Sequence, residues 1–180
     1  MWNIFKSFGF AIKGILFCLI HERNMRIHTV IAAYVLIFST FFDLNKIEYA
    51  ILIITLALVM GAEMINTAVE NLVDLAASSY NNLAKIAKDV AAGAVLVFAV
   101  ASIGVSLCLF WDVPVFIKIY EYFISHIFAL IAFIISIAVA VFYIILGPVK
   151  VSTVYEQQSR KIKTKMNNKT KEEKKPNAKK

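Results

Sequence analysis

The sequence predicts an all-α integral membrane protein. The predicted order is an N-terminal interfacial amphipathic helix, a three-helix core, a fourth transmembrane helix and a disordered basic tail. Of its 180 residues, 60% are hydrophobic and only 17% are charged, and the mean hydropathy is +0.73. These values lie outside the range of ordinary soluble domains. A membrane helix needs roughly 20 residues to cross about 30 Å of hydrocarbon, so the apolar stretches use most of the chain.

The formal net charge of +7 is concentrated at the C-terminus. Residues 150–180 contain 11 Lys and Arg and 3 Asp and Glu, whereas residues 1–149 contain 8 and 9. The tail is therefore +8 (11 minus 3) and the rest of the chain −1 (8 minus 9). The Lys-rich, low-complexity composition predicts that 149–180 is disordered. This basicity indicates membrane topology or contact with anionic lipids rather than nucleic-acid binding.

The N-terminal segment, about residues 3–20, is predicted to be an interfacial helix. Its large apolar residues recur at helical spacing on one side, while Lys6 and Lys13 lie elsewhere on the helix. The same two lysines interrupt the apolar run, and no small-residue cleavage site follows it. We therefore do not expect a signal peptide.

Three membrane helices follow, at about 25–42, 47–78 and 88–111. The first has a short apolar run, "TVIAAYVLIFSTFF", and is long enough to cross only if its helix includes part of the polar turn "HERNMRIH". The second contains no Pro and only Gly61 as a helix-weakening residue. Its roughly 30 residues would measure about 45 Å, which exceeds the membrane thickness. One of its ends must project into water.

A fourth membrane segment is predicted within 113–148. The apolar run 123–146 follows "WDVPVFIKIYEY" and is closed by Gly147 and Pro148. Lys and Arg gather before the first span, between the second and third, and after the fourth. The positive-inside rule then predicts a multi-pass protein of the cytoplasmic membrane with both termini in the cytoplasm.

The second membrane helix carries a polar stripe. Four side chains lie within an arc of roughly 80° on an α-helix: Glu63, Asn66, Glu70 and Asp74. A single polar residue there would only pack against another helix or face a water-filled crevice. Several carboxylates near hydrocarbon cost a few kcal/mol or more and usually mark a functional site.

The stripe suits phosphoryl transfer at the membrane surface. Mg²⁺ that also binds phosphate needs few carboxylates, because water and phosphate oxygens fill its other positions. We expect Glu22 at the level of Glu70, with Lys88 and Asp89 entering the same layer. Glu63 is then placed to accept the proton of a lipid hydroxyl. The sequence contains neither a P-loop nor a protein-kinase glycine loop.

Three blocks carry a resemblance to a known family: "HERNMRIH", "GAEMINTAVENLVD" and "YNNLAKIAKDVAAGAVL". Together they resemble the prokaryotic diacylglycerol kinase family, whose Gram-positive members include undecaprenol kinases. The similarity covers about residues 5–112. It implies that residues 1–112 form a lipid-kinase core of one interfacial and three membrane helices, and that the protein is a homotrimer with active sites shared between neighbouring subunits.

The resemblance also implies roles for individual residues, with ATP as phosphoryl donor and Mg²⁺ as cofactor. The implied catalytic residues are Glu63 and Asn66, and the metal ligands are Glu22 and Glu70. The implied nucleotide-binding residues are Glu22, Glu70, Asp74, Lys88 and Asp89. The polar positions expected on the substrate side are Asn24, Arg26 and His28.

Undecaprenol is the favoured acceptor, and diacylglycerol is the alternative. His28 stands where diacylglycerol-directed members of the Gram-negative type carry an acidic residue, which favours the polyprenol. Two other classes of protein remain as alternatives: a carboxylate-lined cation transporter and a non-catalytic membrane scaffold. A transporter would need an acidic residue at mid-membrane on a second span, and the third and fourth predicted spans have none.

Overall fold

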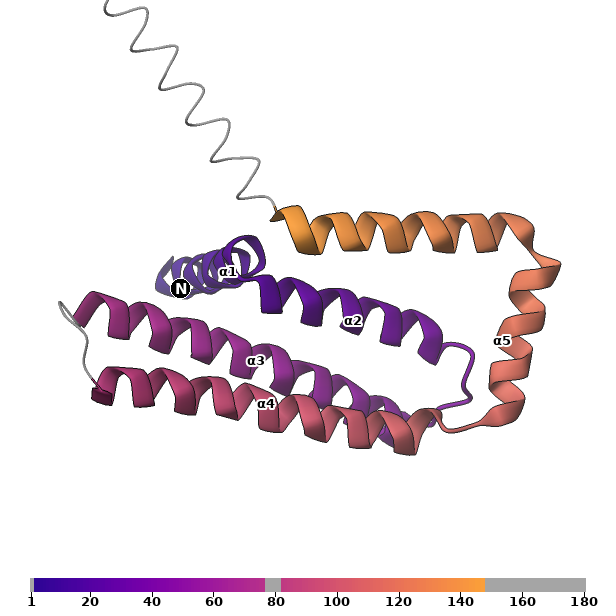
Figure 1. Ribbon diagram of the computed structural model, residues 1–180, viewed down its shortest axis with the longest axis horizontal. Helices are drawn as coiled ribbons and strands as arrows, with labels where there is room; N and C mark the ends of the chain where they lie inside the picture. Colours follow the sequence, from indigo (N-terminus) through magenta and orange to yellow (C-terminus); the bar gives the residue numbers. More distant parts are fainter. Residues whose placement is uncertain (1, 77–81, 148–180) are drawn as a thin grey trace, which may run out of the picture.

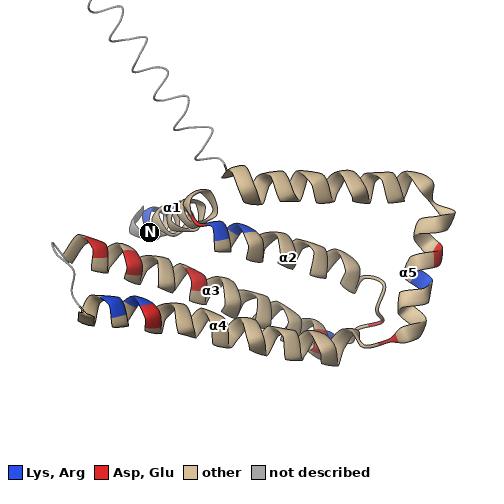
Figure 2. Ribbon diagram, in the orientation of Figure 1, with Lys and Arg blue, Asp and Glu red and all other residues tan. Residues whose placement is uncertain are grey.

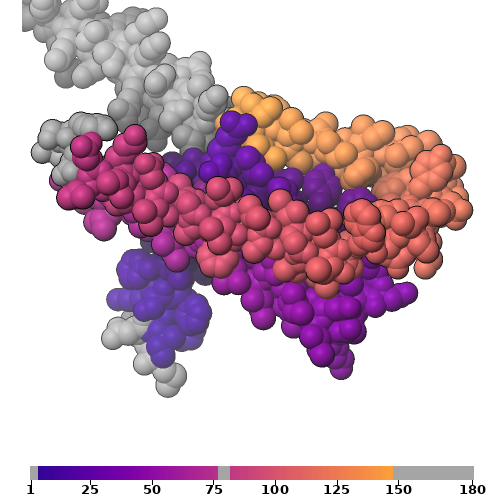
Figure 3. All heavy atoms as spheres, turned by 60° about the horizontal axis from the view of Figure 1, so that its bottom comes forward, coloured from indigo at the N-terminus to yellow at the C-terminus, as the bar shows by residue number. Residues whose placement is uncertain are grey.

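The protein forms an elongated bundle of helices in the computed structural model, which describes residues 2–76 and 82–147 (Figure 1). The helices are α1 (Trp2–His21), α2 (Arg23–Ser39), α3 (Lys46–Ala76), α4 (Asn82–Phe110), α5 (Val113–Ser125) and a C-terminal helix (Ile127–Gly147). α2, α3, α4 and the C-terminal helix follow the long axis, while α1 and α5 run across its two opposite ends (Figures 1 and 3). The predicted basic tail, 149–180, lies outside the described residues.

Within the described part of the chain, four helices are long and apolar enough to cross a membrane: Ile4–His21, Lys46–Ala76, Asn82–Phe110 and Ile127–Gly147. The protein is therefore a multi-pass membrane protein. α3 has 31 residues, or about 46 Å, so it extends beyond the hydrocarbon layer. α1 has the length for a crossing, but it lies across the bundle axis (Figure 3). This direction agrees with the predicted interfacial position.

α2 begins and ends earlier than the predicted 25–42. Glu22 is its extended N-cap residue, with φ −94° and ψ 121°, so the polar turn after it forms the first turns of the helix. At the other end, the Ser39 hydroxyl donates to the Leu36 carbonyl at 2.8 Å and the Thr40 hydroxyl to the Ile37 carbonyl at 2.7 Å. These bonds supplement the backbone hydrogen bonds of the last turn, where the Ile37 carbonyl also accepts from the Thr40 N–H at 3.3 Å.

α4 begins at Asn82, six residues before the predicted start at 88. No Gly or Pro between these positions would interrupt a helix. Lys88 and Asp89 consequently lie in the second turn of α4 rather than at its first residue. The predicted end of α3 at residue 78 lies outside the described residues.

The predicted segment 113–148 is two helices rather than one. α5 occupies most of the expected connecting loop and stops at His126, whose φ of −122° and ψ of 76° are not helical. Asp112 caps α5, because its Oδ1 accepts from the Val115 N–H at 3.4 Å, and Pro114 stands in the first turn. An acidic N-cap followed by a proline is a usual helix start, so this signal was present in the sequence.

The C-terminal helix packs on α2 through aromatic rings and side-chain hydrogen bonds, one of which joins Tyr34 and Ser136. Phe133 lies edge-on to Tyr34 and Phe38, with ring centroids 6.0 and 5.5 Å apart. The Tyr34 and Ser136 hydroxyl oxygens are 2.9 Å apart. Because the Ser136 hydroxyl donates to the Phe133 carbonyl at 2.7 Å, Tyr34 is the donor to Ser136.

Tyr34→Phe should lower the stability of the protein in detergent by about 0.6–1.7 kcal/mol, the range measured for interhelical hydrogen bonds in membranes. The substitution keeps the ring contacts and removes only the donor. Thermal unfolding measures the change. Tyr120→Phe is the matched control, because Tyr120 is exposed on α5. Equal melting temperatures for the two variants would contradict a stabilising role for the bond.

Charged residues gather at the two ends of the bundle (Figure 2). One end holds α1, the start of α2, the end of α3 and the start of α4, and it contains most of the described Lys and Arg residues together with a row of acidic residues on α3. The C-terminal helix also finishes at this end (Figure 1). Lys46 and Lys118 lie on α3 and α5 toward the opposite end. The predicted basic segments within the described residues therefore share one side.

Candidate active site

The inner part of the polar stripe of α3, Glu63 and Asn66, is buried where α1 crosses the bundle. Glu63 is only 2% exposed, and Asn66 and Thr67 are also buried. The thiol of Cys18, on α1, lies within hydrogen-bonding reach of the Thr67 side chain. α1 thus covers this face of α3. A carboxyl group enclosed in this way requires hydrogen bonds or a cation, because burying an unpaired charge is costly.

Two further carboxylates, Glu22 and Glu70, lie within electrostatic range of Glu63. These two carboxylates are close enough to interact electrostatically with Glu63, and the side-chain amide of Asn24 lies within hydrogen-bonding reach of it. Glu22 and Asn24 come from the start of α2, so the junction between α1 and α2 brings them onto α3. Like charges held together repel each other unless a cation or proton joins them. The cluster is therefore suited to receive a cation.

Two acceptor atoms beside these carboxylates are unsatisfied. The Asn66 side-chain nitrogen donates to Glu70 Oε1 at 2.9 Å. The Oδ1 atom of the same Asn66 side chain has no hydrogen-bond partner. Of the three buried side-chain polar atoms in the described part of the chain that lack a hydrogen bond, two are Asn66 Oδ1 and Glu63 Oε2. A buried unsatisfied group costs about 1–3 kcal/mol. The lack of a partner at both oxygens indicates that a ligand would supply a hydrogen-bond donor or a cation there.

Asp74 and Lys88, predicted to bind nucleotide, are paired with each other in an ion pair between α3 and α4. Asp74 lies one turn beyond Glu70 and is exposed, as is Asp89 next to Lys88. The Asp74–Lys88 pair forms the outer edge of the site. A nucleotide contact by Lys88 would use the same ammonium that now binds Asp74.

The predicted substrate-side residues have three different environments. The Asn24 side chain lies within hydrogen-bonding reach of Glu63. Arg26 is buried and directs its guanidinium toward main-chain carbonyls of Ile20 and Ile144, at 2.8 and 3.5 Å. His28 lines a cavity between α2, α3 and α4. The structure thus brings Asn24 into the carboxylate cluster and does not bring Arg26 there.

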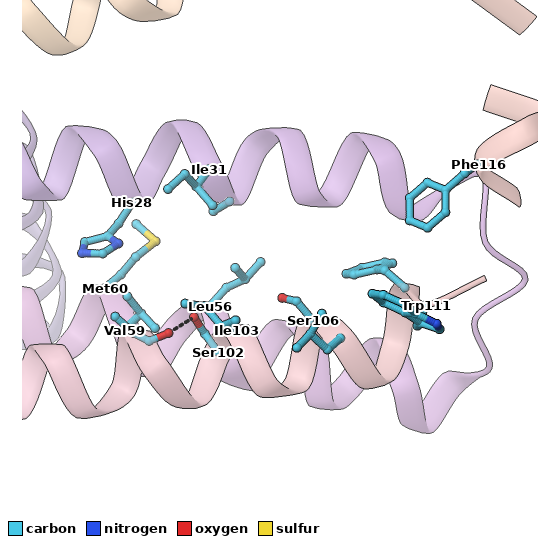
Figure 4. A pocket seen from close by; sticks show the side chains of 14 residues that line it. His28, Ile31, Leu56, Val59, Met60, Ser102, Ile103, Ser106, Trp111 and Phe116 are labelled. Carbon is cyan, nitrogen blue, oxygen red and sulfur yellow. Dashed lines mark hydrogen bonds between the residues drawn. The ribbon is translucent and has the colours of Figure 1, made fainter. Parts of the chain in front are cut away.

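The cavity has a volume of about 490 Å³ and a largely apolar wall. His28 and Met60 stand at the end nearest the carboxylates, and Trp111 and Phe116 at the other (Figure 4). Met60 precedes Glu63 by one helical turn on α3. The cavity therefore leads away from the carboxylate cluster toward the opposite end of the bundle, and its shape suits a hydrocarbon chain.

Of the cavity residues named above, only His28 was predicted from the sequence, as a polar position on the substrate side. Met60 belongs to an apolar helix with nothing to distinguish it, and Trp111 is equally consistent with an interfacial anchor. Phe116 belongs to α5, which was not predicted as a helix. The Asp112 cap and Pro114 were the available signal, but they give no direction for α5 relative to the bundle.

The carboxylate oxygens near Glu63 are the kind of ligand that suits a magnesium ion bound together with a nucleotide. The described residues include no group of three or more His, Cys, Asp or Glu side chains arranged to hold a metal by themselves. Mg²⁺ bound to nucleotide needs only one or two carboxylates, with water and phosphate oxygens as its other ligands. Glu22 and Glu70 would supply that number, since both lie within electrostatic range of Glu63, whose Oε2 is unsatisfied.

Comparison with known proteins covers the part of the chain that forms this site. The profile of the family described as "Prokaryotic diacylglycerol kinase" matches residues 9–110. This range contains the second part of α1, from residue 9 on, and the whole of α2, α3 and α4, whereas α5 and the C-terminal helix lie outside it. Every predicted site residue falls within the matched range.

Three relatives illustrate the similarity. The chain is 44% identical over 108 residues to a diacylglycerol kinase of Synechocystis sp., covering 59% of this chain and 62% of that protein. It is 42% identical over 108 residues to an undecaprenol kinase of Bacillus subtilis, covering 60% and 88%. It is 31% identical over 110 residues to a diacylglycerol kinase of Escherichia coli K12, covering 61% and 90%. The match thus spans about six tenths of the Synechocystis protein and most of the other two.

The profile covers more than half of the chain, and it includes the buried carboxylate, the amides beside it and the outer ion pair. The chain therefore belongs to the prokaryotic diacylglycerol kinase family, a family of membrane-bound lipid kinases that use ATP as the phosphoryl donor.

Proposed function

We propose that this member of the family transfers the γ-phosphoryl group of Mg-ATP to the hydroxyl of undecaprenol, giving undecaprenyl phosphate. The observation that carries the proposal is the position of Glu63. It is buried among Glu22, Asn24 and Glu70, one turn from the cavity residue Met60. A lipid chain in the cavity would bring its terminal hydroxyl to this carboxylate.

Glu63 is the general base in this proposal. Its Oε2 has no hydrogen-bond partner, so it is free to accept the proton of the hydroxyl as that oxygen attacks phosphorus. Asn66 Oδ1 is also unpaired and would accept a hydrogen bond from the same hydroxyl in the ground state. The Asn66 amide holds Glu70 in place. The chain thus positions the acceptor and takes up its proton.

Glu22 and Glu70 would hold the magnesium ion of the nucleotide. When bound, the ion neutralises charge on the phosphate oxygens. Lys88 lies further out and would exchange its bond to Asp74 for a phosphate oxygen, because an ammonium binds phosphate as a point charge. Asp74 and Asp89 would then contact the rest of the nucleotide.

Two observations support a polyprenol acceptor. The cavity is elongated and has His28, not a carboxylate, at the end near Glu63 (Figure 4). One hydrocarbon chain suits such a space better than the two chains of diacylglycerol. The relative from B. subtilis, matched over 88% of its length, is an undecaprenol kinase. Diacylglycerol is the second candidate, because the relatives from Synechocystis and E. coli are diacylglycerol kinases.

We place the carboxylate end of the bundle on the cytoplasmic side of the cytoplasmic membrane, because Lys and Arg gather there. The N-terminus and the tail would then be cytoplasmic, and the basic tail would lie near anionic lipid headgroups. We also propose a homotrimer. Glu70 is only partly covered and Asp74 is exposed in one subunit, so a neighbouring subunit would complete the nucleotide site.

Side-by-side phosphorylation of undecaprenol and dioleoylglycerol in the same mixed micelles tests the acceptor. With γ-labelled ATP and Mg²⁺, we expect kcat/KM for undecaprenol to exceed that for dioleoylglycerol by about tenfold or more. Dioleoyl phosphatidylcholine, which has no free hydroxyl, is the control. A preference for dioleoylglycerol would establish the alternative, and label in neither alcohol would reject both acceptors.

A further inference from the structure

The C-terminal helix, which the family profile does not include, ends against Arg26. Its last residue, Gly147, has a φ of 53°, a left-handed conformation that favours glycine. A Cβ at this position would lie 2.8 Å from Arg26 Cζ and 3.0 Å from each Nη nitrogen. The guanidinium therefore lies directly against the backbone of Gly147, and any side chain there would displace it.

Arg26 joins the last turns of two helices. Its Nη1 donates to the Ile20 carbonyl of α1 at 2.8 Å, and its Nη2 to the Ile144 carbonyl of the C-terminal helix at 3.5 Å. Carbonyls in a last turn lack helical partners and carry the negative end of the helix dipole. A planar guanidinium offers separate donors to both carbonyls, whereas a lysine ammonium is a single point. Arg26 is 7% exposed, so solvent contributes little to this contact.

The same arginine lies beside the candidate active site. It follows Glu22 by one helical turn, and its backbone N–H donates to the Glu22 carbonyl at 3.3 Å. Asn24, whose side chain lies within hydrogen-bonding reach of Glu63, stands between Glu22 and Arg26 in the sequence. Any movement of Arg26 relative to α1 would move the first turn of α2 and, with it, Glu22 and Asn24.

We propose that Arg26 is a positioning residue that clamps α1, α2 and the C-terminal helix together and thereby sets Glu22 and Asn24 against Glu63. The inference rests on the proposed function, and it gives the additional helix a role in the site. Substrate binding by Arg26 is the competing role. The geometry opposes it, because both Nη nitrogens already bond to carbonyls, and the Nε that has no partner is buried.

Gly147→Ala and Arg26→Lys test the clamp in the full-length protein. Gly104→Ala is the matched control, because a methyl group added at Gly104 meets no atom within 4 Å. For both test variants, we expect the Mg²⁺ concentration giving half-maximal activity to rise about tenfold, the lower range for residues that support metal ligands, and KM for the lipid to stay unchanged. Hydrogen exchange should quicken at the amides of residues 18–26 in both test variants and not in the control.

The exchange measurement separates this inference from the proposed function, since it needs no turnover. If the wild-type protein phosphorylates neither lipid, the proposed function is rejected. Hydrogen exchange at residues 18–26 then tests by itself whether Arg26 clamps the three helices. Wild-type exchange at residues 18–26 in Arg26→Lys would overturn the clamp, as would a Gly147→Ala variant that behaves like the control.

A double-mutant cycle keeps the test decisive if Gly147→Ala folds poorly. Once Arg26→Ala has removed the guanidinium, Gly147→Ala should add little further change in exchange at residues 18–26. Effects that simply add would show that Gly147 acts independently of Arg26, and the clamp would be rejected.

Discussion

Glu63→Gln should lower kcat for lipid phosphorylation by about 10²–10⁴-fold, the range for loss of a general base. Glutamine has the size of glutamate and can keep a hydrogen bond to Asn24, so packing around α3 should be preserved. It cannot take up the proton of the acceptor hydroxyl. We therefore expect Glu63→Gln to keep the wild-type fold and to lose most of its phosphoryl-transfer activity.

Initial rates at saturating Mg-ATP and lipid measure this change. The control is Glu121→Gln on α5, where the side chain is exposed and lies at the other end of the bundle (Figure 2). Melting temperatures of the two variants in detergent show whether folding is intact. Activity within threefold of wild type in Glu63→Gln would remove Glu63 from the mechanism.

Glu70→Gln should raise the Mg²⁺ requirement by about 10–100-fold. The Asn66 amide donates to one Glu70 oxygen at 2.9 Å, which leaves the other available to a cation. Glutamine removes the negative charge and places an amide, a hydrogen-bond donor, on one side of the group. A neutral ligand binds a hard divalent cation more weakly than a carboxylate does.

Mg²⁺ titration at fixed ATP separates the two residues. Glu70→Gln should recover much of its rate at high Mg²⁺, whereas Glu63→Gln should not. Glu48→Gln, at the first turn of the same helix, serves as the control and should keep the wild-type Mg²⁺ dependence. An unchanged titration curve in Glu70→Gln would exclude Glu70 as a ligand of the ion.

The polar stripe of α3 could be predicted because it depends on one helix alone. Its spacing follows from 3.6 residues per turn, and charge in an apolar helix is unusual enough to indicate a site. The structure shows Glu63 and Asn66 buried on that helix, with Glu22 and Asn24 brought to them from α2. The roles of these residues in catalysis and metal binding remain predictions that the two substitutions test.

The direction of α5 and the contacts of Arg26 could not be predicted from the sequence. α5 has a capping aspartate and a proline at its start, but helix signals give no angle between consecutive helices. That angle places Phe116 at the far end of the cavity (Figure 4). Arg26 was predicted to be a polar residue on the substrate side. Its partners, Ile20 and Ile144, are main-chain carbonyls, and a contact across 118 residues cannot be read from spacing.

The sequence by itself determined the all-α membrane class, the stripe on α3 and the grouping of basic segments, since these follow from composition and from periodicity within single helices. Only the tertiary structure decided that α1 covers Glu63, that Lys88 pairs with Asp74 and that the C-terminal helix ends on Arg26. These contacts join helices distant in the chain. Their geometry depends on how whole faces pack, which no local pattern of residues specifies.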